Sequence, residues 1–216
     1  RIEEGDRVAI DGGTGLIVFG PCRRRCTMPD GVAKLLEWTT DYRETRVIAT
    51  VAHELDVEGA ADLGADGFLV LVPEALCLSS GRDTSAESLA RSLARLLEAA
   101  GPERRVFIDA DPDRPPLLLP GLTSESVVRA AEEASHLIGR SVALLGADAP
   151  PLWHADRDDP GGPVVVFAEA SNLESAANRA SLVPGGLLAC APKLVPAARL
   201  AAARVALRDP VFTDPG

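Results

Sequence analysis

The residues best suited to chemistry follow short apolar runs that are typical of strands. Asp109 and Asp111 stand at the end of one such run, and Asp113 continues the alternation into a proline-rich segment. Glu169 follows another run. Carboxylate oxygens are the ligands that hard cations such as Mg²⁺ take. These acids therefore indicate either a metal site or solvated loop residues, and Glu169 has the further alternative of an acid at the start of a helix.

Cys190 ends the apolar run at 187–190. In barrel enzymes the active site gathers at the carboxyl ends of the strands, so this position suits a catalytic thiol. The alternative is a small buried thiol that only packs. Cys22 and Cys26 resemble half a zinc site, but no second ligand pair with suitable spacing follows them. The cysteines therefore predict free thiols in a reducing compartment, without zinc.

Apolar runs alternate with amphipathic stretches along most of the chain. Strands are expected at 47–51, 67–72, 105–110, 141–145, 164–168 and 187–190, and helices at 31–42, 55–63, 84–100, 123–138, 173–182 and 196–207. Continuous apolar runs are typical of parallel strands that are buried on both faces. The sequence therefore predicts an α/β fold, a shortened or irregular (β/α) barrel with six mainly parallel strands instead of eight.

The composition narrows the classes of partner. The 216 residues suffice for one sizeable core, and the formal charge of −10 opposes binding to nucleic acid or to an anionic membrane surface. No apolar run approaches the roughly 20 residues that a membrane span needs, and the first residues lack the apolar segment of a secretion signal. A cytoplasmic protein without a nucleic-acid or membrane partner is expected.

The first residues are typical of a β-hairpin. Two β-patterned runs, at 7–10 and 16–19, flank the turn D-G-G-T-G at 11–15, whose glycines suit positive φ. With Gly5 and Asp6, this segment resembles the G-D-x-V-x-x-D-G-x-x-G-x-V hairpin that closes the swivelling phosphohistidine domain of phosphoenolpyruvate-utilising enzymes. Pyruvate phosphate dikinase and phosphoenolpyruvate synthase belong to that family. There the hairpin precedes an α/β barrel that binds phosphoenolpyruvate or pyruvate.

The resemblance continues to about residue 120. Residues 49–68 are similar to the family's first strand and helix, residues 71–77 match its L-C-R-T-E-H-M-F motif, and residues 106–112 match V-T-I-R-x-L-D-P. It implies that Glu74 and Asp109 lie at substrate-contact positions.

The resemblance also implies roles for residues later in the chain. Cys190 corresponds to the family's cysteine that protonates the enolate, and Glu169 to a carboxylate that binds Mg²⁺. The two arginines that hold the substrate correspond to Val72 and Asp109 here. Because arginine supplies bidentate contacts and permanent charge, phosphoenolpyruvate is expected to bind no more tightly than about millimolar, roughly 4 kcal/mol.

Two functional hypotheses follow from the resemblance. In the first, the chain is the phosphoenolpyruvate- or pyruvate-binding domain of a dikinase-like phosphotransferase, with a weakened or altered active site. In the second, it is a non-catalytic remnant of that family that serves dimerisation or binds a small ligand. Arginines that converge on a pocket would favour the first hypothesis. The arginines in question are Arg82, Arg104, Arg105, Arg114 and Arg140.

The resemblance implies two domains, with residues 1–28 as the end of the swivelling domain and its linker and residues 29–216 as the barrel. Closely spaced alanines in the predicted helix at 196–207 suit packing against a neighbouring chain. A shortened barrel also leaves strand edges that need cover. Both features predict a homodimer that buries about 1,600 Å²; the alternative is that this helix covers its own sheet.

Overall fold

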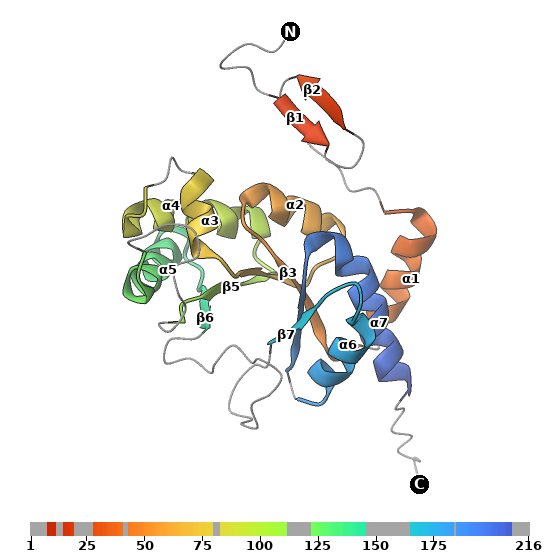
Figure 1. The fold of residues 1–216 in the computed structure, drawn as a ribbon. Coiled ribbons are helices and arrows are strands. Elements are labelled where there is room, and N and C mark those ends of the chain that lie inside the picture. The colour runs from red at the N-terminus through yellow and green to blue at the C-terminus, as the bar shows by residue number, and fades with distance from the viewer. Residues whose placement is uncertain are drawn as a thin grey trace.

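The computed structural model describes residues 8–11, 15–19, 28–40, 43–79, 83–111, 122–145, 165–183 and 185–208. Strands β1 (Val8–Asp11) and β2 (Leu16–Phe19) form an antiparallel hairpin in which Val8 pairs with Phe19. Gly15 has the positive φ of 72° that the turn requires. The predicted hairpin is therefore confirmed, and Figure 1 shows it standing apart from the main sheet.

The main sheet contains six parallel strands. They are β3 (Arg46–Thr50), β4 (Gly67–Val70), β5 (Arg105–Asp109), β6 (Ala143–Leu145), β7 (Val165–Ala168) and β8 (Leu187–Cys190). Their order is β6-β5-β4-β3-β8-β7, so the last strand returns to lie beside the first. Chain order is thus kept around a curled sheet that lacks pairing only between β6 and β7 among the described strands. The predicted α/β fold with a shortened barrel of parallel strands is confirmed.

Helices cover the convex outer face of this sheet (Figure 1). They are α1 (Asp30–Thr40), α2 (Glu54–Asp62), α3 (Pro73–Ser79), α4 (Ala86–Ala100), α5 (Ser124–Ile138), α6 (Leu173–Ser181), the short 3₁₀ turn η1 (Pro192–Leu194) and α7 (Val195–Arg208). The longer ones start where the sequence supplies a cap. The Ser85 side chain accepts the Ser88 N–H before α4, and Thr123 accepts the Ser126 N–H before α5.

Side chains along each strand alternate between two apolar layers. The outer face packs on the helices and includes Val47, Phe68, Val106, Val166 and Leu188. The inner face of the curl consists of Ile48, Leu69, Phe107, Leu145, Val165, Leu187 and Ala189, all buried. Both faces are therefore apolar, which explains why the strands read as continuous apolar runs.

The structure corrects one expectation and limits another. The second strand ends at Val70, not at residue 72, and the helix α3 begins at Pro73. Proline suits this first helical position because its missing N–H would have no intrahelical partner. Of the closely spaced alanines of α7, Ala198, Ala202 and Ala203 are buried where α7 packs on α6, β3 and α1, whereas Ala197 is exposed.

None of the helices in the described ranges combines the length and the apolar character needed to cross a bilayer.

Candidate functional site

The six strands end along one edge of the sheet, which we call the carboxyl edge. Thr50 and Asp109 are the last residues of β3 and β5, and Glu169 directly follows β7. In parallel α/β folds this edge carries the binding and catalytic groups, because the loops that follow the strands meet there.

Asp109 is a buried carboxylate at the carboxyl edge. It is only 3% exposed, and the alternation along β5 places it on the inner face, two residues after Phe107. The register pairs it with Leu145 on β6. The backbone N–H of Asp111 donates to its Oδ1 over 3.1 Å, which fixes the carboxylate at the end of the strand. An acid that ends an inner-face strand at this edge of the sheet is the feature that most strongly suggests a site.

Polar groups from β3 and the loop after it lie at the same edge. The hydroxyl of Thr50 donates to the carbonyl oxygen of Cys190 over 3.3 Å. His53 caps α2, because its Nδ1 accepts the Leu55 N–H over 3.1 Å, while Asp56 accepts the His53 N–H. An Nδ1 that accepts a hydrogen bond leaves the ring proton on Nε2. His53 is therefore a helix-capping histidine.

Cys190 lies on the other face of the sheet from Asp109. Its side chain belongs to the outer apolar layer and is 2% exposed. Burial raises the pKa of this thiol to about 12. The thiol is therefore protonated at neutral pH, and the sheet backbone separates it from the inner face.

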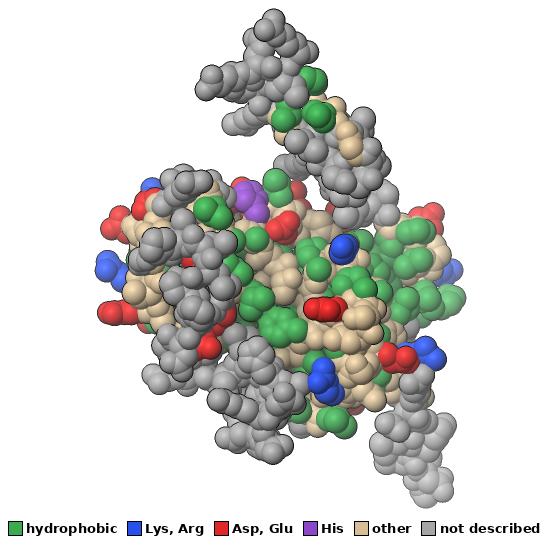
Figure 2. All heavy atoms as spheres, viewed as in Figure 1, with side chains coloured by type: hydrophobic (Ala, Val, Ile, Leu, Met, Phe, Trp, Pro, Cys, Tyr) green, Lys and Arg blue, Asp and Glu red, His purple; other side chains and the backbone are tan. Residues whose placement is uncertain are grey.

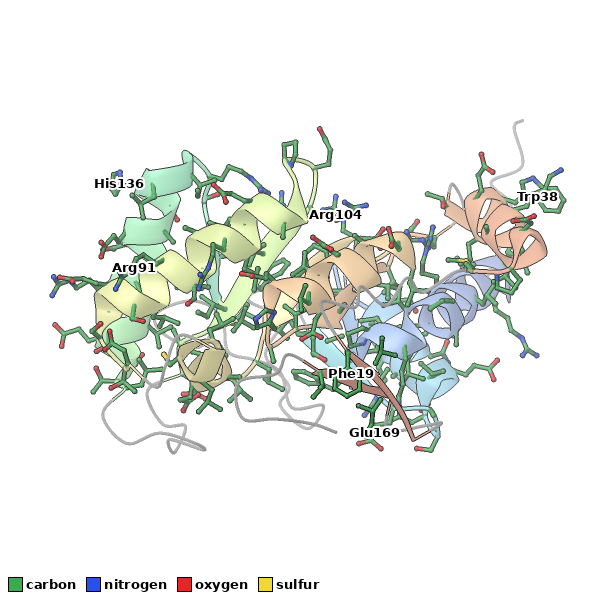
Figure 3. All side chains as sticks on the ribbon, turned by 90° about the horizontal axis from the view of Figure 1, so that it is seen from above. Phe19, Trp38, Arg91, Arg104, His136 and Glu169 are labelled. Atoms are coloured by element: carbon green, nitrogen blue, oxygen red, sulfur yellow. The ribbon has the colours of Figure 1, made fainter. Side chains whose placement is uncertain are left out.

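Glu74 and Glu169 differ sharply in environment. Glu74 lies in the first turn of α3 and is 6% exposed. It is close to Cys77, since the pKa of that thiol is raised first by burial and then by the charges of Glu74 and Asp83. Glu169 is exposed (Figure 3), and its N–H donates to Oδ1 of Asn172 over 2.8 Å. Of the residues predicted for the site, Asp109 and Glu74 are therefore buried, Glu169 is exposed, and Cys190 lies on the opposite face of the sheet from Asp109.

The carboxyl edge suits a Mg²⁺ ion that takes few protein ligands. Within the described ranges, no group of three or more Asp, Glu, His or Cys side chains could hold a metal. Mg²⁺ is commonly bound by one or two carboxylates together with water and ligand oxygens. Asp109 and the partly buried Asp111 are the carboxylates whose positions fit such a site.

The arginines that could have replaced the missing substrate contacts lie at the opposite end of the sheet. Arg104 donates from Nε to the Ala65 carbonyl over 3.1 Å, and Arg140 donates to the Leu97 and Arg104 carbonyls. Arg105 opens β5 and lines a cavity at the start of the strands. The other two, at positions 82 and 114, lie outside the described residues.

Sequence reasoning missed Lys193, which follows β8 in η1 and has an exposed side chain. It is the third residue after β8 and therefore adds a cation near the carboxyl edge. The lysine in Ala191-Pro192-Lys193, just after the last strand, was the signal that could have identified it.

Among known proteins, distant likenesses are found to solved structures. No family model matches the chain, and no curated protein matches it. Among solved structures it is similar to 2,3-dimethylmalate lyase, described as a PEP mutase/isocitrate lyase superfamily member, with 14% identity and a TM-score of 0.33. The match covers 83% of this chain and 62% of that one, so the chain spans less than two thirds of the lyase. The likeness is to a lyase superfamily, not to a dikinase, and at this level it assigns no activity.

Proposed function

We propose that this chain is a barrel domain that binds a small organic acid of the pyruvate or phosphoenolpyruvate type at its carboxyl edge. The observation that carries the proposal is Asp109. Its carboxylate is 3% exposed, at the last residue of β5 and on the inner face of the sheet. In a curled parallel sheet this is where ligand-binding groups meet. The sequence resemblance of residues 49–112 to phosphoenolpyruvate-utilising enzymes supports the same class of ligand.

The negative charge of the carboxyl edge determines how an organic acid could bind there. Asp109, Asp111 and Glu169 would repel an anionic ligand, and no arginine of the described ranges directly follows a strand. A bound Mg²⁺ would supply the positive charge that joins carboxylates to an organic acid. Asp109 and Asp111 would hold the cation, and Lys193 would offer a hydrogen-bonded charge to the ligand's carboxylate.

Calorimetric titration with phosphoenolpyruvate and with pyruvate, each with and without Mg²⁺, tests the proposal. We expect Mg²⁺-dependent binding in the millimolar range, about 4 kcal/mol. Asp109→Asn should abolish it, whereas Asp62→Asn, an exposed acid on α2, should leave it unchanged. Phosphoenolpyruvate binding that does not need Mg²⁺, or that survives Asp109→Asn in a folded protein, would overturn the proposal. Asp111→Asn provides a less buried second variant.

The finer assignments rest on the sequence resemblance. We propose a dikinase-like phosphotransferase ancestry, with Glu74 as a substrate contact and Glu169 as a further Mg²⁺ ligand. The resemblance also gives Cys190 the role of proton donor, which requires a ligand that reaches the end of β8 from the outer face of the sheet. Assaying Cys190→Ala, Glu74→Gln and Glu169→Gln for phosphoryl transfer tests each role. Cytoplasmic location stays a prediction.

The domain division and the homodimer are proposals of the same kind. Ile17, Val18 and Phe19 of the hairpin are 43%, 38% and 58% exposed, which suits a segment that packs against further β-structure, as the division at residue 28 expects. For the dimer, the suitable surface is on α1, where Leu35 and Trp38 are 42% and 60% exposed. Figure 2 shows hydrophobic side chains gathered over α1, and in Figure 3 Trp38 projects away from the body. Exposed apolar clusters of this kind mark interaction sites.

A further inference from the structure

A cavity of about 320 Å³ lies at the opposite end of the sheet from the carboxyl edge. We call it the amino-edge cavity. Its floor is formed by the inner-face side chains Ile48, Phe107 and Leu187, which are 1%, 5% and 5% exposed. Arg46 and Arg105, the first residues of β3 and β5, also line it. The cavity therefore combines an apolar floor with two cationic side chains.

Gly67 begins the strand that lies between the two arginines. The strand β4 lies between β3 and β5, and its first residue, Gly67, pairs with Ile48 on one side and Arg105 on the other. Side-chain alternation places this position on the inner face, because Phe68 belongs to the outer layer. A Cβ at Gly67 would meet the Arg105 carbonyl oxygen at 2.8 Å and Cγ2 of Ile48 at 3.3 Å. The middle strand thus contributes no side chain to the cavity.

The described side chains that line the cavity leave an excess of one positive charge. Asp66 is neutralised, because both terminal nitrogens of Arg43 and the Val47 N–H donate to its carboxylate. The side chains of Arg46, Arg105 and Glu44 take part in no hydrogen bond or ion pair within the described part of the chain. Two arginines and one glutamate give a net charge of +1, in a protein whose formal charge is −10. Such a local reversal of sign favours an anionic ligand.

We propose that the amino-edge cavity binds a monocarboxylate with a short apolar body. Guanidinium groups bind carboxylates through paired, charge-assisted hydrogen bonds, and an apolar floor gives the body of the ligand its contact area. A single negative charge matches the excess of one positive charge. The volume is about ten times the roughly 30 Å³ that a water molecule occupies in the liquid, which suits a ligand of about ten non-hydrogen atoms.

This binding site is independent of the one at the carboxyl edge. Arg105 and Asp109 stand at opposite ends of β5, about 13 Å apart at the usual strand rise. The amino-edge cavity contains no residue that would hold Mg²⁺ in the function proposed above. Its ligand therefore binds without a divalent cation and without Asp109.

Titration of the ¹⁵N-labelled chain with benzoate tests the proposal, with the Nε–Hε signals of Arg46 and Arg105 as local reporters. We expect both signals to shift with a dissociation constant in the millimolar range, about 4 kcal/mol. Benzamide has the same shape without the charge, so it should bind about tenfold more weakly or not at all. Shifts of equal size with benzamide, or benzoate shifts confined to other residues, would overturn the proposal.

Substitutions in the cavity should change the affinity for benzoate in opposite directions. Arg46→Gln and Arg105→Gln should each weaken benzoate binding about tenfold, and Arg105→Lys should weaken it less. Glu44→Gln should strengthen it, because it removes the negative charge beside the ligand. Arg129→Gln, at an exposed position on α5, is the matched control and should have no effect. If folded Arg46→Gln and Arg105→Gln proteins bind benzoate like the parent chain, the assignment is wrong; Asp109→Asn should leave this binding intact.

Discussion

Replacing Asp66 by asparagine should destabilise the fold more than its surface position suggests. Asp66 lies just before β4, with its side chain 23% exposed, while the side chain of its partner Arg43 is only 5% exposed. The Asp66 carboxylate accepts two hydrogen bonds from Arg43, one of them 2.5 Å long, and a third from the Val47 N–H over 2.7 Å. Asparagine keeps one acceptor oxygen and loses the charge.

The magnitude follows from the buried charges that remain. Removing one partner of a buried ion pair costs about 3–5 kcal/mol, because the other charge stays in a poorly solvated site. Partial exposure of Asp66 and the retained oxygen favour the lower end, about 3 kcal/mol. Arg199 adds to the effect. It is 8% exposed, its Nε has no hydrogen-bond partner within the described residues, and its pKa is lowered by burial and by Arg43 and raised by Asp66.

Urea denaturation measures this loss directly, and thermal unfolding should show a drop of about 6–12 °C for a domain of this size. Asp62→Asn, at an exposed position on α2, should change the free energy of unfolding by less than about 0.5 kcal/mol. Replacing Arg199 by methionine should then cost less in the Asp66→Asn protein than in the parent chain, since it removes a cation without a counter-charge. A loss below about 1 kcal/mol for Asp66→Asn would refute the reasoning, because it would show that Arg43 is solvated.

Three further predictions concern other parts of the chain. Burial raises the pKa of Cys190 from 9.0 to about 12. The contribution of this thiol to stability is therefore full below pH 9 and is lost as the pH rises towards 12, by up to about 4 kcal/mol. Urea unfolding compared at both ends of this pH range should show a smaller loss in Cys190→Ala than in the parent chain. Gly186→Ala should lower the free energy of unfolding by about 3 kcal/mol, since the new Cβ would lie 2.0 Å from the Ala180 carbonyl oxygen; an unchanged urea midpoint would contradict this. If α1 forms the dimer interface, light scattering at micromolar concentration should give twice the chain mass of 22.6 kDa, and Trp38→Glu should give the mass of one chain; a parent chain that stays monomeric on concentration would reject the dimer.

The sequence predicts the elements of this fold better than the positions of their side chains. The six strands and most helices were expected because parallel strands buried on both faces stand out as apolar runs. The same property hides which face each residue occupies. In β8, Leu187 to Cys190 are all buried, so no polar residue marks the phase of the alternation. For this reason the sequence could not show that Cys190 and Asp109 lie on opposite faces.

The two edges of the sheet differ in how well they could be foreseen. Acids that follow strands, such as Asp109, were recognised because they end apolar runs. The amino-edge cavity was not expected, because it depends on the register that sets Gly67 between the strands of Arg46 and Arg105. The register across three strands is set by tertiary packing, so it cannot be predicted from any one segment of the sequence. The helix α3 was missed for a related reason, since seven residues give too short a pattern to separate from a loop.

The return of β8 to the side of β3 has a consequence for synthesis of the protein. Thr50 and Cys190, joined by a hydrogen bond at the carboxyl edge, are 140 residues apart in the chain. At ribosomal rates of about 5–20 residues per second, β8 is therefore synthesised about 7–28 s after β3. Until then one edge of the nascent sheet is unpaired and open to other strands. The chain should depend on chaperones for that interval, and a ribosome that stalls before β8 should release a product prone to aggregation.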